Sequence, residues 1–96
     1  MTYYKLSNSA KEDLIRIHQF GVERFGMRQA DKYFRESFES FERIASDPYS
    51  FISVDFIRQG YRKCQCGVDT IYFRINSDIV EIMSIVGRQD LENELK

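Results

Sequence analysis

The stretch of sequence that decides the fold is residues 60–87, which read GYRKCQCGVDTIYFRINSDIVEIMSIVG. Apolar and polar side chains alternate with a period of two through most of it, which is typical of β-strands with one buried face. Gly67 and residues 76–78 (Asn-Ser-Asp) interrupt the alternation with residues that favour tight turns. The predicted strands are 61–66, 70–75 and 79–86. Because tight turns join antiparallel neighbours, this stretch predicts an antiparallel sheet.

The chain before Pro48 has helical spacing instead. In the first predicted helix, apolar or small side chains recur on one face. They are Ala10, Leu14, Ile17, His18, Gly21 and Phe25. All three residues at 7–9 suit the N-cap position, and Ser9 with Glu12 matches the capping box S-x-x-E. Gly26 suits the position just past the C-terminal end of this helix.

A second helix follows at once and carries its own apolar face. That face comprises Met27, Ala30, Phe34, Phe38, Phe41 and Ala45. The helix ends near Asp47, because Pro48 cannot continue it. A single glycine between two helices favours an antiparallel helical hairpin. Residues 3–6 predict a short first strand, and the tail 88–96 predicts a short helix.

These elements predict one α+β domain over residues 1–96, with the order β-α-α-β-β-β. The expected architecture is an antiparallel sheet with the helical hairpin packed on one face. A chain of 96 residues that is 43% hydrophobic can bury one core, and its 8 Phe and 6 Tyr exclude a disordered protein.

The charge and hydropathy of the chain exclude several classes of partner. It has 14 Lys+Arg against 15 Asp+Glu, a net charge of -1 and a pI near 5.8. Such a balance gives no general attraction to phosphate backbones, so no direct nucleic-acid binding is expected. No apolar run is long enough to span a membrane, and the N-terminus lacks a secretory signal. The expected location is the cytoplasm.

The sequence offers little for covalent or metal chemistry. It contains no P-loop, dinucleotide-binding or nucleophile-elbow motif. Cys64 and Cys66 share one face of a predicted strand, where they are poorly placed to bridge each other. Zinc would need two more ligands, and the lone histidine, His18, lies on the apolar stripe of the first helix. We therefore expect two buried or half-buried free thiols, no catalytic residue, no metal ion and no cofactor.

Charge is unevenly distributed along the second half of the chain. Residues 56–77 carry a net charge of +3, and residues 78–96 carry a net charge of -3. The basic segment is either an ordinary solvated face or a docking surface for an acidic partner. A third interpretation is a ribonuclease site without histidine, in which basic groups stabilise a phosphorane and a tyrosine handles protons. Its residues would be Arg62, Lys63, Tyr72, Arg74 and Arg88.

Six short motifs occur in order along nearly the whole chain. They are Leu6-Ser7 with Ala10, Asp13-Leu14 and Ile17; Phe25-Gly26 with Gln29-Ala30 and Tyr33; Asp47-Pro48; Arg58-Gln59-Gly60-Tyr61-Arg62; Ile71-Tyr72-Phe73-Arg74; and Glu81-Ile82 with Ile85-Val86-Gly87-Arg88-Gln89-Asp90. Each motif alone is weak. As a series they resemble the ParE toxins, a branch of the RelE/ParE superfamily of type II toxin–antitoxin systems.

The resemblance implies a β-α-α-β-β-β toxin of the bacterial cytoplasm that contributes to plasmid stabilisation. It implies a hetero-oligomer with a ParD-like antitoxin encoded beside it, and DNA gyrase as the target. The RelE relatives share the fold but cleave messenger RNA on the ribosome. The acidic pI and the single lysine before the terminal residue in the second half, Lys63, favour ParE. A RelE-like ribonuclease and a silent remnant that still binds its antitoxin remain the alternatives.

The residues themselves suggest where partners bind, because a helical hairpin on one face of a small sheet leaves a groove and the exposed-looking aromatics of the 48–59 loop have no evident role in the core. We expect an amphipathic antitoxin helix to lie against the helical hairpin and the chain to continue across the sheet. The candidate contacts are Phe20, Tyr33, Phe51, Phe56, Arg58, Arg62 and Arg74. For toxicity the candidates are Arg88, Gln89 and Asp90, because Gly87 permits a sharp change of direction and Arg88 carries a planar fork of five donors. An ion pair between Arg88 and Asp90 that only anchors the C-terminus is the competing interpretation.

Overall fold

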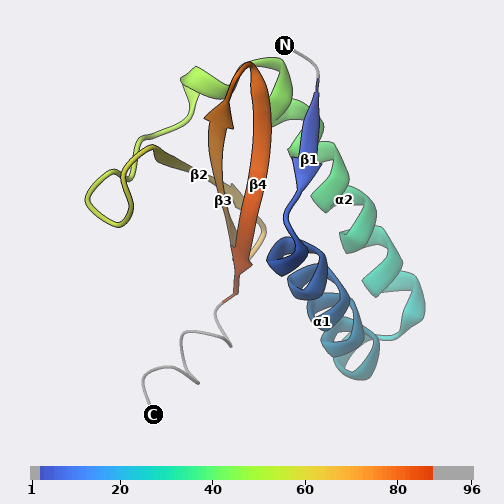
Figure 1. Cartoon of the computed structure of the whole chain (residues 1–96). Coiled ribbons are helices and arrows are strands. Elements are labelled where there is room, and N and C mark those ends of the chain that lie inside the picture. The colour runs from blue at the N-terminus through green and yellow to red at the C-terminus, as the bar shows by residue number, and fades with distance from the viewer. Residues whose placement is uncertain (1–2, 88–96) are drawn as a thin grey trace.

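The computed structural model describes residues 3–87 of the chain, and the predicted order of elements is confirmed (Figure 1). The helices are α1 (Asn8–Phe25) and α2 (Met27–Ser46), and a 3-10 turn covers Pro48–Ser50. The strands are β1 (Tyr4–Leu6), β2 (Tyr61–Cys66), β3 (Asp69–Asn76) and β4 (Ile79–Val86). Neither described helix is long and apolar enough to cross a membrane.

The four strands form one sheet in the order β1-β4-β3-β2. The β2–β3 and β3–β4 pairs are antiparallel, as their tight turns require. The β1–β4 pair is parallel, so the sheet is mixed and differs here from the antiparallel sheet expected. The reason is that β1 connects to the other strands only through the helical hairpin. No tight turn sets its direction, and a connection through two helices is long enough for a parallel pair.

The hairpin of α1 and α2 covers one face of the sheet, and the core lies between the two layers (Figure 1). Phe41 of α2 and Phe73 of β3 are both 0% exposed. The predicted free thiols are confirmed, because Cys64 and Cys66 are buried on this face without a disulfide. The opposite face of the sheet, here called the open face, carries polar side chains such as Lys63 and Arg74, as the alternation of each strand dictates.

Single residues begin and separate the helices. The N-cap of α1 is Ser7, whose hydroxyl accepts a hydrogen bond of 3.0 Å from the amide of Ala10. The expected capping box at Ser9 and Glu12 is wrong, because α1 begins at Asn8 and Ser9 is already helical. Gly26 ends α1 and begins α2 with a φ of 90°. That backbone conformation favours glycine, which is why the hairpin turns on this residue.

Candidate functional site

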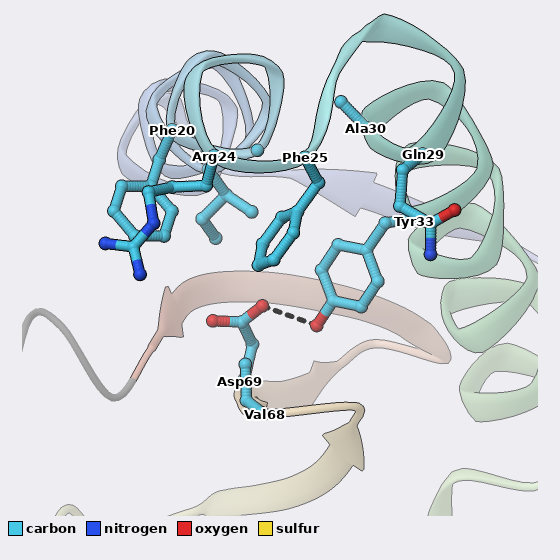
Figure 2. A pocket seen from close by; sticks show the side chains of 10 residues that line it. Phe20, Arg24, Phe25, Gln29, Ala30, Tyr33, Val68 and Asp69 are labelled. Carbon is cyan, nitrogen blue, oxygen red and sulfur yellow. Dashed lines mark hydrogen bonds between the residues drawn. The ribbon is translucent and has the colours of Figure 1, made fainter.

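A cavity of about 550 Å³ opens where the end of the helical hairpin meets the turn between β2 and β3 (Figure 2). Side chains from α1, α2 and this turn face one another across it. The residues that define it are Phe20, Arg24, Phe25, Tyr33, Val68 and Asp69. A concave, mainly apolar site with a few polar groups is the usual form of a binding site.

The apolar walls of this cavity are open to solvent. Phe25 is 67% exposed and Val68 is 70% exposed, whereas Ala10 and Leu14, on the same stripe of α1 as Phe25, are buried. An apolar stripe on a helix typically faces the core along its whole length. The last residue of this stripe instead lines the cavity, because the stripe extends beyond the buried part of the interface. Exposed apolar side chains that gather around a hollow typically mark a surface for a partner.

One wall of the cavity is polar and fixed by Tyr33. Its hydroxyl donates to Oδ2 of Asp69 over 2.5 Å and also lies 2.5 Å from the carbonyl oxygen of Cys66. Burial, followed by the Asp69 carboxylate, raises the pKa of Tyr33 well above its ordinary value of 10.0. The tyrosine therefore stays protonated at neutral pH and acts as a donor. Asp69 is only 5% exposed, so this hydrogen bond is sheltered from water.

Gly67 lets the β2–β3 turn approach Tyr33. Its φ is 59°, and a Cβ built at this position would lie 2.8 Å from Cε1 of the Tyr33 ring. A side chain here would therefore collide with the tyrosine as well as adopt a strained backbone. The sequence marks Gly67 as a turn residue but gives no sign of this contact, because Tyr33 is far away in the chain.

The predicted aromatic contacts do not form one cluster. Phe20 and Tyr33 line the cavity, as the figure shows (Figure 2). Phe51 is half-buried and packs edge-on against the core residue Phe73, with ring centroids 5.8 Å apart. Phe51 therefore has a core contact, which the sequence did not indicate for an aromatic of this loop. Phe56 is 85% exposed on the loop that precedes β2.

The predicted arginines lie on different surfaces. Arg62 pairs with the core residue Phe73 in the β2–β3 register, so its side chain starts from the helix-covered face of the sheet. Because β2 is an edge strand, this side chain extends outward at the edge of that face. It donates to the carbonyl of Phe51 over 2.6 Å and lies over the Tyr49 ring at 5.3 Å. Arg58 lies over the ring of Tyr61 at 5.7 Å.

Arg74 lies on the open face and is held by an ion pair. Its Nε is 2.6 Å from Oε1 of Glu81, and Nζ of Lys5 is 3.3 Å from the other oxygen. The hydrogen bond from Arg74 holds the pKa of Glu81 below its usual range. Lys63 and Tyr72 are cross-strand partners on the same face. The register therefore separates Arg62 from Lys63, Tyr72 and Arg74 and divides the basic surface that the sequence predicts.

The expected toxicity residues, Arg88, Gln89 and Asp90, lie outside the described residues. The last described residue, Gly87, is buried at the end of β4. Within residues 3–87, no three His, Cys, Asp or Glu side chains gather as a metal site would require.

The whole chain was also compared with known proteins. Residues 4–91 match the family model described as the ParE toxin of the type II toxin–antitoxin system parDE. The chain belongs to the ParE toxin family.

Named members of this family align along almost the full length of the chain. The chain is 31% identical over 94 residues to Toxin ParE1 of Mycobacterium tuberculosis, covering 96% of both chains. It is 35% identical over 86 residues to Toxin ParE1 of Caulobacter vibrioides, covering 90% of this chain and 88% of that protein. These relatives confirm the resemblance drawn from the six motifs.

Solved structures support the ParE-type fold. A chain of the chromosomal ParDE toxin–antitoxin system from P. aeruginosa superposes with a TM-score of 0.80 at 19% identity, covering 91% of this chain and 96% of that one. A conserved hypothetical protein from Helicobacter pylori gives a TM-score of 0.58 at 14% identity, covering 95% and 99%. At these identities the likeness concerns the fold alone.

Proposed function

We propose that this ParE-family chain acts in the bacterial cytoplasm as an inhibitor of DNA gyrase and is held inactive by a ParD-like antitoxin. Membership of the ParE toxin family over residues 4–91 is the observation that carries this proposal. The acidic pI supports a protein target rather than ribosomal RNA, which favours strongly basic ligands.

We assign the apolar cavity at the end of the hairpin to the antitoxin. Phe20, Phe25 and Val68 offer the apolar contacts that one face of an amphipathic helix needs. At the rim, the Arg24 guanidinium lies 5.4 Å from the centroid of the Phe20 ring and supplies a cation for an antitoxin carboxylate. From there the antitoxin continues toward the loop that carries Phe56 and Arg58.

Replacing Phe20 with alanine is expected to weaken antitoxin binding by about tenfold or more, because buried aromatic anchors dominate the energy of such interfaces. The measurement is calorimetric titration with the product of the adjacent reading frame. Ile15→Ala is the matched control, since Ile15 is also on α1, is 58% exposed and does not line the cavity. Phe56→Ala tests the second part of the path. Wild-type affinity in both Phe20→Ala and Phe56→Ala would exclude this surface.

Expression without the antitoxin is expected to cause filamentation and a DNA-damage response. The purified chain is expected to inhibit supercoiling by gyrase in a relaxed-plasmid assay, and added antitoxin should restore supercoiling. Rapid cleavage of translated messages with supercoiling untouched would instead assign the chain to the RelE-type ribonucleases. In that case Lys63, Tyr72 and Arg74, which share the open face, would be the first residues to replace.

A further inference from the structure

Strand β4 extends further than the strand that covers its outer edge. In the described part of the chain, β1 is three residues long and pairs with Val80–Ile82, whereas β4 continues to Val86. The edge of β4 beyond Ile82 therefore needs other partners for its backbone groups. Amide and carbonyl groups left without partners at a partly buried edge would be costly.

A β-bulge determines which of these groups face outward. Tyr72 pairs with Ser84 but Phe73 pairs with Ile82, so Met83 is an extra residue in β4. An extra residue reverses the alternation of the strand beyond it. As a result Ile85 is buried at 3% exposure, although strict alternation from Val80 and Ile82 would have buried Ser84.

Two side chains of the α1 region take the place of the missing strand. The Ser7 hydroxyl donates to the carbonyl oxygen of Met83 over 2.8 Å. The Ile85 amide donates to Oδ2 of Asp13 over 2.9 Å, although the two residues are 72 positions apart. The Asp13 side chain is only 19% exposed, and its other oxygen accepts from Nη2 of Arg16 over 2.8 Å. Hydrogen bonds from amides to a sheltered carboxylate are among the stronger ones in proteins.

We propose that Asp13 is a positioning residue for the toxic end of the chain. By holding the amide of Ile85, it fixes the last residues of β4, after which Gly87 and the candidate toxicity residues follow in the sequence. This inference rests on the proposed function and on the candidate toxicity residues Arg88, Gln89 and Asp90, which follow Gly87 in the sequence. Asp13 contacts the edge of β4 and lies outside the lining of the cavity assigned to the antitoxin.

The test compares Asp13→Ala with Asp13→Asn. The alanine variant removes the acceptor for the Ile85 amide, whereas asparagine keeps one carbonyl oxygen at the same reach. Asparagine loses the charge and replaces the other oxygen, which accepts from Arg16, with an NH2 group that can only donate. Asparagine therefore separates the hydrogen bond to Ile85 from the ion pair with Arg16. Glu12→Ala, an exposed neighbour on α1, is the matched control. Ser7 is a poorer choice for the test, because its hydroxyl also caps α1.

We expect the Ile85 amide of Asp13→Ala to exchange with solvent at least about tenfold faster in NMR experiments below the melting temperature. About tenfold more Asp13→Ala protein should be needed to inhibit growth and supercoiling, while antitoxin affinity stays within about threefold of wild type. Asp13→Asn should recover most of the exchange protection and most of the inhibition. Glu12→Ala should match wild type in every measurement.

Two results would overturn the inference. One is wild-type inhibition by Asp13→Ala. The other is a parallel loss of inhibition and antitoxin binding, which would mean general destabilisation. Failure of the proposed function gives a different result. If wild type inhibits growth but not supercoiling, the gyrase target is wrong, and the growth assay still decides the role of Asp13. A wild type that inhibits neither would refute both.

Discussion

Replacing Phe41 with alanine is expected to lower the free energy of unfolding by about 3–5 kcal/mol, because it removes a large buried side chain and leaves a cavity. Phe41 is 0% exposed and joins the helical layer to the sheet. Its ring centroid lies 5.6 Å from that of Tyr4 in β1 and 5.3 Å from that of Phe38 in α2. Urea denaturation of the purified chain measures the change.

The matched control for this prediction is Phe34→Ala. Phe34 is on the same helix but is 37% exposed, so its loss should cost at most about half as much. A domain of this size has about 5–15 kcal/mol of stability in total, so Phe41→Ala will be close to unfolding. Phe41→Leu, which keeps most of the volume, provides a folded intermediate for the series. Equal losses for Phe41→Ala and Phe34→Ala would show that Phe41 is not central to the core.

Replacing Arg88 with alanine is expected to abolish growth inhibition while leaving the fold and antitoxin binding intact. The proposed reason is that the guanidinium of Arg88 donates two parallel hydrogen bonds to a carboxylate or phosphate on the target. Arg88→Lys keeps the charge but loses this geometry, and it should also be strongly impaired. Growth on inducing plates, circular dichroism and antitoxin titration are the three measurements.

Arg35→Ala on the exposed surface of α2 is the control for this series. If Arg88 only anchors the C-terminus through Asp90, the pair is worth about 0–1 kcal/mol. Arg88→Ala would then lower the melting temperature slightly and remain toxic, and the assignment of Arg88 to the target would be wrong.

Much of the fold follows from local sequence patterns. The β2–β3–β4 strands are predicted because alternation and turn residues coincide at each end. The turn after β3 is an example: Ser77 and Asp78 adopt φ values of 51° and 67°, a conformation that favours short polar residues. The helical hairpin is predicted because Gly26 and Pro48 end two apolar stripes.

The features that the sequence does not reveal depend on long-range pairing. The parallel direction of β1 depends on which strand it meets, and nothing in residues 3–6 specifies this. The bulge at Met83 is hidden because Ser84 and Ile85 lie between apolar neighbours that fit either register. The sequence also does not reveal that the side chains of Arg62 and Arg74 lie on opposite faces of the sheet, because this depends on the register between β2 and β3.

The candidate site was predicted only in part. Phe20 and Tyr33 were identified as apolar side chains of the helical hairpin that an antitoxin helix could contact, although packing at the flank of a helix was the competing interpretation. Asp69 and Gly67, which contact Tyr33 from the opposite side, were not, because periodicity indicates which face a residue occupies and not what lies across from it. Arg24 was missed for the same reason.

The pairing of β1 with β4 has a consequence for biosynthesis. Tyr4 pairs with Val80, so β1 has no strand partner until β4, much later in the chain, has been synthesised. At about 5–20 residues per second, the synthesis of Val80 follows that of Tyr4 by about 4–15 s, and during that interval β1 lacks its partner strand. A nascent chain that stops before residue 80 leaves Tyr4–Leu6 unpaired.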